Sequence, residues 1–227
     1  MVQIAKKSKV KRFIYASSSS VYGLKSEKNV TEEVSLEPLT DYSKFKVECE
    51  KILKPFNSED FTTVTIRPAT VCGYSRRQRL DVVVNILTNL AFNKREISIF
   101  GGKQLRPNIH IDDMVQSYIS VLNAHKSIIN GEIFNVGYKN QTVTELADEV
   151  KQIIGSDVVI KKTDSDDNRA YHVSSDKIFN EIGFSPKKTV KDAVDDLKVA
   201  FQQKILVNTF ENEFFYNIKR MNNINLI

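Results

Sequence analysis

Short runs of apolar and β-branched residues recur along the chain, separated by polar stretches, and each predicts a strand. Most of these runs are continuous rather than alternating between apolar and polar positions. A continuous run is typical of a strand that is buried on both faces, as in a parallel sheet. The predicted strands cover residues 12–16, 61–67, 97–100, 133–136 and 158–161.

Between these runs the sequence predicts helices, and two of them carry recognisable start signals. Asp112 or Asp113 can cap a helix that reaches about residue 124, and Thr142 with Glu145 resembles a capping box. Strands that alternate with helices indicate a parallel α/β sheet. The other predicted helices cover residues 2–8, 41–53, 80–92, 175–182 and 190–203.

Glycine is absent from the places where a nucleotide-binding α/β protein would need it. No G-x-G-x-x-G or related glycine cluster occurs at any strand-to-helix turn of the 227 residues. A pyrophosphate normally rests on such a turn and on the helix that follows it. We therefore expect a sequence that starts in the middle of a domain, without the first βαβ units. Residues 163–169 predict a loop, and the tail after Gln203 shows little period.

Composition narrows the class of protein without choosing a function. Hydrophobic residues make up 41% and charged residues 27%, as in an ordinary soluble domain. No long apolar run and no signal peptide is seen, and Cys49 and Cys72 form no disulfide framework, so we expect a cytoplasmic protein without a membrane partner. Three histidines make a metal site improbable. The net charge of +5 is spread out, so nucleic acid is not an expected partner.

Candidate chemistry lies on the helix predicted over residues 41–53. Tyr42 and Lys46 are four residues apart, so both side chains lie on one face. A nearby ammonium favours the phenolate and lowers a tyrosine pKa, so such a tyrosine can act as a general base. Alone, the pair is more often an exposed helical pair without a function. Four serines, residues 17–20, follow the first strand directly, where ligands bind in open α/β sheets. The alternative for these serines is a loop that caps the next turn.

Several motifs, in the order in which the family carries them, resemble those of the extended short-chain dehydrogenases/reductases that act on nucleotide sugars. The resemblance covers nearly the whole chain and rests on four motifs above all. These are Tyr15-Ala-Ser-Ser-Ser-Ser-Val-Tyr-Gly23, Ile66-Arg-Pro-Ala-Thr-Val-Cys-Gly73, Arg106-Pro-Asn-Ile-His-Ile-Asp-Asp113 and Gly131-Glu-Ile-Phe-Asn-Val-Gly137. The fold implied is a partial Rossmann-like doubly wound parallel sheet with a smaller C-terminal α/β substrate-binding part.

The resemblance also implies roles for individual residues. Tyr42 would be the base, Lys46 would bind the nicotinamide ribose, and Ser18 would position the sugar hydroxyl. Arg67 and Pro68 would lie at the cofactor, which would be NAD, with NADP possible. The substrate would be a nucleotide sugar held by Ser18, Ser19, Arg106 and Arg169. Arginine suits a diphosphate because its planar fork binds two oxygens, although surface salt bridging is the alternative for both arginines. Asp112 and Asp113 would be cap and packing residues, His110 a buried strand histidine, and Cys72 is given no chemistry.

The division of the chain and the reaction follow from the same resemblance. Residues 1–75 would be the C-terminal half of a cofactor domain and 76–227 mainly a substrate-binding part, with 107–137 packing back on the first sheet. Dehydratases and decarboxylases of this kind carry a carboxylate just after the catalytic Ser or Thr, where this chain has Ser19 and Ser20. That favours a 4-epimerase or a simple reductase, with a possible homodimer in the intact enzyme. The alternatives are a non-catalytic remnant that binds a partner, and a nucleotide-sugar dehydratase or reductase.

Overall fold

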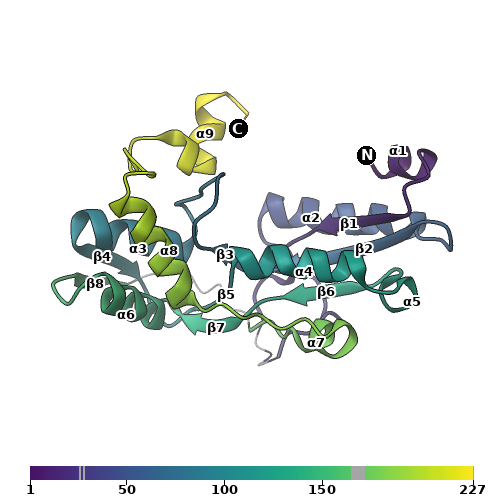
Figure 1. The fold of residues 1–227 in the computed structure, drawn as a ribbon, viewed down its shortest axis with the longest axis horizontal. Coiled ribbons are helices and arrows are strands. Elements are labelled where there is room, and N and C mark those ends of the chain that lie inside the picture. The colour runs from purple at the N-terminus through teal and green to yellow at the C-terminus, as the bar shows by residue number, and fades with distance from the viewer. Residues whose placement is uncertain (26, 28, 165–171, 227) are drawn as a thin grey trace.

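The computed structural model describes residues 1–25, 27, 29–164 and 172–226. Three small sheets lie along the long axis of an elongated molecule (Figure 1). The mixture of helices with mainly parallel strands confirms the α/β class. The strands are β1 (Arg12–Ala16), β2 (Thr62–Pro68), β3 (Thr70–Cys72), β4 (Glu96–Phe100), β5 (Leu105–His110), β6 (Ile133–Val136), β7 (Lys139–Thr142) and β8 (Val159–Thr163).

The first sheet has the order β1-β2-β6, and both pairings are parallel. β2 is the central strand and is buried from Thr62 to Arg67, as its run of β-branched residues predicts. β6 pairs with β2 through Thr65 and Ile133, although 64 residues separate the two strands along the chain. The carboxyl ends of β1 and β2 therefore lie side by side, which brings the serines after β1 next to Pro68.

Helices pack on both halves of the molecule. α4 and α7 contribute Met114, Val121 and Ile178 to the core of the first sheet. Around β4 and β8, a second core is built from α3, α6 and α8. The helices and 3-10 turns are α1 (Val2–Lys7), η1 (Ser19–Tyr22), α2 (Asp41–Leu53), η2 (Lys54–Phe56), α3 (Val83–Lys94), α4 (Ile111–Asn123), α5 (Lys126–Ile129), α6 (Val143–Ile154), α7 (Asp176–Ile182), α8 (Val190–Gln202), η3 (Glu213–Phe215) and α9 (Asn217–Asn223).

The third sheet, β3-β5-β7, lies between the two halves in Figure 1 and was not predicted as a unit. β5 is parallel to β3 but antiparallel to β7, with Arg106 opposite Gln141. Both β5 and β7 carry polar residues such as Asn108 and Asn140, so neither shows the apolar run of a buried strand. The division of the chain at residue 75 stays a prediction.

The cap of α4 corrects one expectation from the sequence. α4 starts at Ile111, and its N-cap is His110, whose ring Nδ1 accepts a hydrogen bond from the Asp112 backbone N–H at 3.1 Å. Neither aspartate is therefore the cap. The buried Asp113 carboxylate instead accepts hydrogen bonds from the backbone of Lys187 and Lys188.

Among the described helices, none combines the length and apolar character needed to cross a membrane.

Candidate active site

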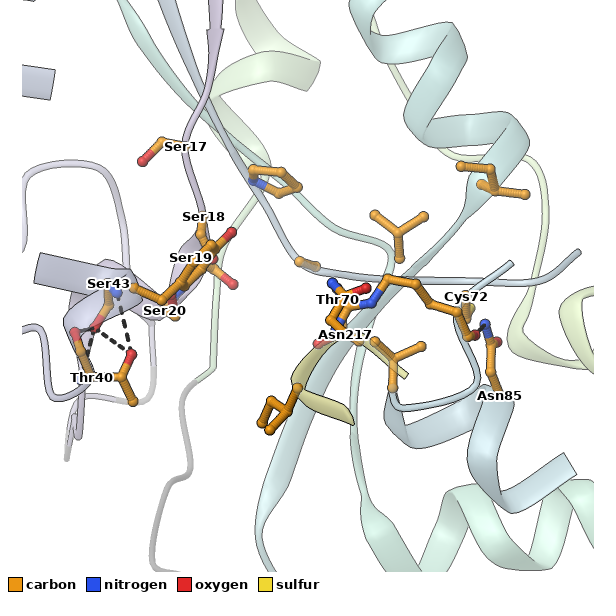
Figure 2. A pocket seen from close by; sticks show the side chains of 18 of the residues that line it. Ser17, Ser18, Ser19, Ser20, Thr40, Ser43, Thr70, Cys72, Asn85 and Asn217 are labelled. Atoms are coloured by element: carbon orange, nitrogen blue, oxygen red, sulfur yellow. Dashed lines mark hydrogen bonds between the residues drawn. The ribbon is translucent and has the colours of Figure 1, made fainter. Parts of the chain in front are cut away.

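A cavity of about 870 Å³ opens at the carboxyl ends of β1, β2 and β3. One wall carries the serines after β1 together with Thr40, Tyr42 and Ser43 from the start of α2. The opposite wall is built by the residues after β2 and by the starts of α3 and α9. Figure 2 shows this division, with Ser17–Ser20 facing a second group that includes Thr70, Asn85 and Asn217.

The serine wall has a defined shape because the chain turns sharply after β1. Ser18 caps η1, and its Oγ accepts a hydrogen bond from the Ser20 N–H at 3.2 Å and lies 2.9 Å from the Ser20 Oγ. Gly23 ends the turn with a φ of +69°, and an added Cβ there would lie 1.9 Å from the Glu37 carbonyl oxygen. Ser17 Oγ is buried beside the cavity without a hydrogen-bond partner among the described residues.

Tyr42 and Lys46 lie one turn apart on α2, as their spacing predicts. Tyr42 lines the cavity and its side chain is 58% exposed. Lys46 Nζ lies 5.4 Å from the centre of the Tyr42 ring and 5.2 Å from that of Tyr15. It donates a 2.7 Å hydrogen bond to the Ala16 carbonyl oxygen, at the end of β1. The lysine thus joins α2 to the strand that leads into the serines.

The start of α2 is fixed by a capping box that the sequence did not reveal. Thr40 Oγ1 accepts from the Ser43 N–H, and the Ser43 side chain accepts from the Thr40 N–H (Figure 2). Serine replaces the usual Glu or Gln at the third helical position, which hid the pattern. This cap orients the first turn of α2 and therefore Tyr42.

Arg67 does not line the cavity. Its guanidinium forms a two-pronged ion pair with Glu50 of α2, at 3.1 Å and 2.7 Å, and both side chains are buried. It also donates to the Tyr22 hydroxyl at 2.8 Å, and that hydroxyl donates to Asn135 Oδ1 at 2.7 Å. Burial raises the pKa of Tyr22, so the phenol keeps the proton it donates. This network ties α2, η1, β2 and β6 together behind the site.

Of the other site residues predicted from the sequence, some line the cavity and others do not. Ser19 and Pro68 line the cavity with Ser18 and Tyr42. Arg106 lies on β5, outside the described lining of this cavity, and one of its contacts is a 3.1 Å hydrogen bond to the Leu105 carbonyl oxygen. Arg169 lies outside the described residues.

Other cavity residues were not expected from the sequence. Cys72 is on the wall opposite the serines, and burial raises the pKa of its thiol to about 12, so it stays protonated near neutrality. Arg77 and Arg79 also line the cavity, and their basic loop in the sequence was the available signal. Asn217, Ile218 and Met221 come from the tail, where no periodicity pointed to them.

Comparisons with known proteins show which family this chain resembles in sequence and in fold. Residues 1–137 match the NAD dependent epimerase/dehydratase family. A Bacillus subtilis protein named as an uncharacterized UDP-glucose epimerase is 28% identical over 86% of this chain and 61% of its own length. Human dTDP-D-glucose 4,6-dehydratase is 27% identical over 86% of this chain and 57% of its own.

A solved structure extends the likeness to three dimensions. UDP-glucuronic acid 4-epimerase from Bacillus cereus, in complex with UDP-glucuronic acid and NAD, gives a TM-score of 0.76 at 26% identity. The match covers 89% of this chain and 66% of that one. The chain spans less than two thirds of the two curated relatives above. Because the family match extends over residues 1–137, more than half of the chain, this chain belongs to the NAD dependent epimerase/dehydratase family, whose members are enzymes.

Proposed function

We propose that this chain carries the proton-transfer site of an NAD-dependent nucleotide-sugar 4-epimerase. The observation that carries the proposal is the meeting of Ser18 and Tyr42 on one cavity wall, with Lys46 fastened beside them. The named activities of the relatives, epimerase and dehydratase on nucleotide sugars, support the substrate class.

Each side chain has one task in this proposal. Ser18 Oγ hydrogen-bonds the sugar C4 hydroxyl, and the Tyr42 phenolic oxygen takes the hydroxyl proton as the C–H bond at C4 breaks. The product of this half-reaction is a 4-keto sugar. If the sugar turns over in the cavity before the carbon regains its hydrogen, Tyr42 returns the proton to the other epimer. No atom is gained or lost over the cycle.

The residues present fit the nicotinamide end of the cofactor. The Lys46 ammonium has three N–H donors, and one of them donates to the Ala16 carbonyl oxygen. This hydrogen bond holds the ammonium beside the Tyr42 ring. Lys46 and the Tyr42 hydroxyl would hold the ribose of NAD, with Pro68 close by on the cavity wall. When bound, NAD+ supplies the acceptor for the two electrons and the hydrogen that leave C4.

The lining of the cavity favours an epimerase over a dehydratase. None of its described residues is an aspartate or a glutamate. Loss of water from a 4-keto sugar needs an acid and a base beyond the Ser and Tyr, and Ser19 and Ser20 supply only hydroxyls. An epimerase needs neither, because the same tyrosine removes and returns the proton.

The experiment joins residues 1–227 to the glycine-rich βαβαβα segment of a relative and follows UDP-glucose and UDP-glucuronic acid with NAD+ by NMR. We expect inversion at C4 with an unchanged mass, and loss of that activity in Ser18→Ala. A product lighter by one water would contradict the epimerase proposal and identify a dehydratase.

Three finer points stay proposals. Arg106 and Arg169 are proposed to hold the substrate diphosphate, and removal of Arg106 should then raise KM more than it lowers kcat. A homodimer of the intact enzyme and a cytoplasmic location are also proposed. Size-exclusion chromatography with light scattering tests the first of these two, and cell fractionation tests the second.

A further inference from the structure

The C-terminal segment formed by η3 and α9, residues 213–223, reaches the cavity from the far end of the chain. Asn217, Ile218 and Met221 of α9 all line the cavity. In Figure 1 this segment stands above the middle of the molecule, beyond the last turn of α8. Figure 2 shows Asn217 on the side of the cavity opposite Ser17–Ser20.

Several contacts fix this segment against the loop that precedes α3. The Arg77 guanidinium donates to the Phe214 carbonyl oxygen at 2.5 Å and to Asn217 Oδ1 at 3.1 Å. The Asn217 N–H donates to Asp81 Oδ2 at 2.9 Å, and the Leu80 N–H donates to the Phe215 carbonyl oxygen. The wall is therefore held by side chains and backbone from both segments.

Hydrophobic packing supports the same placement. Phe215 and Tyr216 pack on a small core that contains Leu80 of the loop and Leu197 and Phe201 of α8. The Tyr216 hydroxyl also donates to the Thr209 carbonyl oxygen at 2.8 Å. Because η3 and the start of α9 are anchored in this way, the next turn of α9 has a fixed position at the cavity.

The chemistry of this end of the cavity combines positive charge with uncovered apolar surface. Arg77 and Arg79 line it, with Asp81 beside them as a partial counter-charge. Ile218 is 68% exposed although it faces a cavity, and Met221 is also exposed. A nucleoside diphosphate presents the matching features, two anionic phosphates followed by a ribose and a flat base.

We infer that α9 is the wall of the cavity that contacts the nucleoside of the substrate, with Ile218 and Met221 packing against its base or ribose. The inference rests on the proposed function in one respect, which is the direction of the ligand. With the reacting sugar hydroxyl at Ser18 and Tyr42, the nucleotide extends toward the opposite wall. There Arg77 adds positive charge to that end of the cavity and holds α9 in place through Phe214 and Asn217.

The test uses residues 1–227 as they are, with UDP and dTDP as probes because each is a nucleoside diphosphate without the hexose proposed to react at Ser18 and Tyr42. Hydrogen exchange should slow in peptides that cover residues 213–223 when either nucleotide is added, and should not change over α5, which is remote from the cavity lining. The double variant Ile218→Ala/Met221→Ala should bind the nucleotide roughly tenfold more weakly, as expected for partial loss of two apolar contacts.

Ile224→Ala is the matched control, because Ile224 directly follows α9 and is exposed but does not line the cavity. It should bind the nucleotide like the parent. Equal affinity of parent and double variant, unchanged exchange over residues 213–223, or no binding of either nucleotide would overturn the inference. Failure of the proposed function would give a different pattern. UDP would still slow hydrogen exchange in α9, but the fusion of residues 1–227 with the glycine-rich segment would keep its turnover in the Tyr42→Phe variant.

Discussion

At the scale of single residues, the buried ion pair of Arg67 and Glu50 supports the site although neither residue lines the cavity. It joins the helix that carries Tyr42 and Lys46 to the strand beside the serine turn. Removing one member of a buried pair leaves an uncompensated charge, which costs about 3–5 kcal/mol. We therefore expect Arg67→Met to lower the free energy of unfolding by about that amount in urea titrations.

The control for this variant is Arg95→Met. Arg95 also pairs with a carboxylate, that of Asp157, but the two side chains are 41% and 63% exposed to solvent. Exposed pairs contribute about 0–1 kcal/mol, so this variant should unfold almost like the parent. Equal effects of the two variants would show that the Arg67 network is not a structural anchor.

The positions of Arg67 and of the cavity residues show what the sequence could and could not predict at this scale. Ser18, Ser19, Tyr42 and Pro68 were expected at one site, and the structure brings them to one cavity. Arg67 was expected at the cofactor because the family resemblance implied that role. Alternate residues of a strand face opposite sides, and only the tertiary fold puts Glu50 opposite Arg67.

At the scale of secondary-structure elements, the cap of α2 controls the orientation of the proposed base. Thr40→Ala removes the side-chain acceptor for the Ser43 N–H and should cost about 1 kcal/mol of stability. Because Tyr42 lies in that first turn, we also expect a lower kcat in the completed enzyme, meaning residues 1–227 joined to the glycine-rich βαβαβα segment of a relative. Thr189→Ala removes an equivalent capping box from α8, away from the described lining of the cavity. It should lose similar stability and keep its kcat, and a matching fall in kcat would contradict the positioning role.

Element prediction succeeded where an apolar run, a helical period or a capping signal was clear in the sequence. The strand over residues 12–16, the helix over 41–53 and the capping box at Thr142 are all confirmed. It failed where polar residues build an element, as in β5 and β7, and where a helix is held by tertiary contacts. α9 is such a helix, because its position depends on Arg77 and on Leu80, more than 130 residues earlier.

At the scale of the whole molecule, the residues proposed to hold NAD would contact only its nicotinamide end, and the described cavity has no glycine-rich turn for the pyrophosphate. Residues 1–227 alone should therefore bind NAD+ weakly in isothermal titration, whereas the same residues joined to a glycine-rich βαβαβα segment should bind it tightly. Micromolar affinity of residues 1–227 alone would contradict this and would require another pyrophosphate site.

Exposed apolar side chains lead to a related expectation for the molecule as a whole. Phe45 and Ile52 on α2 and Val115 and Leu122 on α4 are all more than half exposed. Apolar surface of this kind favours association, so residues 1–227 should form oligomers or aggregates in light scattering. A monodisperse monomer at high concentration would show that these faces are tolerated in water.

The measurement that tests the central claim most directly is the turnover number of Tyr42→Phe in the completed enzyme. The ring still packs, but the oxygen that takes the sugar proton is gone, so kcat should fall by about 10²–10⁴-fold with nearly unchanged affinity for the nucleotide sugar. Tyr138→Phe removes the hydroxyl of another exposed tyrosine, outside the described lining of this cavity, and should keep the parental kcat. A Tyr42→Phe enzyme with more than half of the parental turnover would contradict the account.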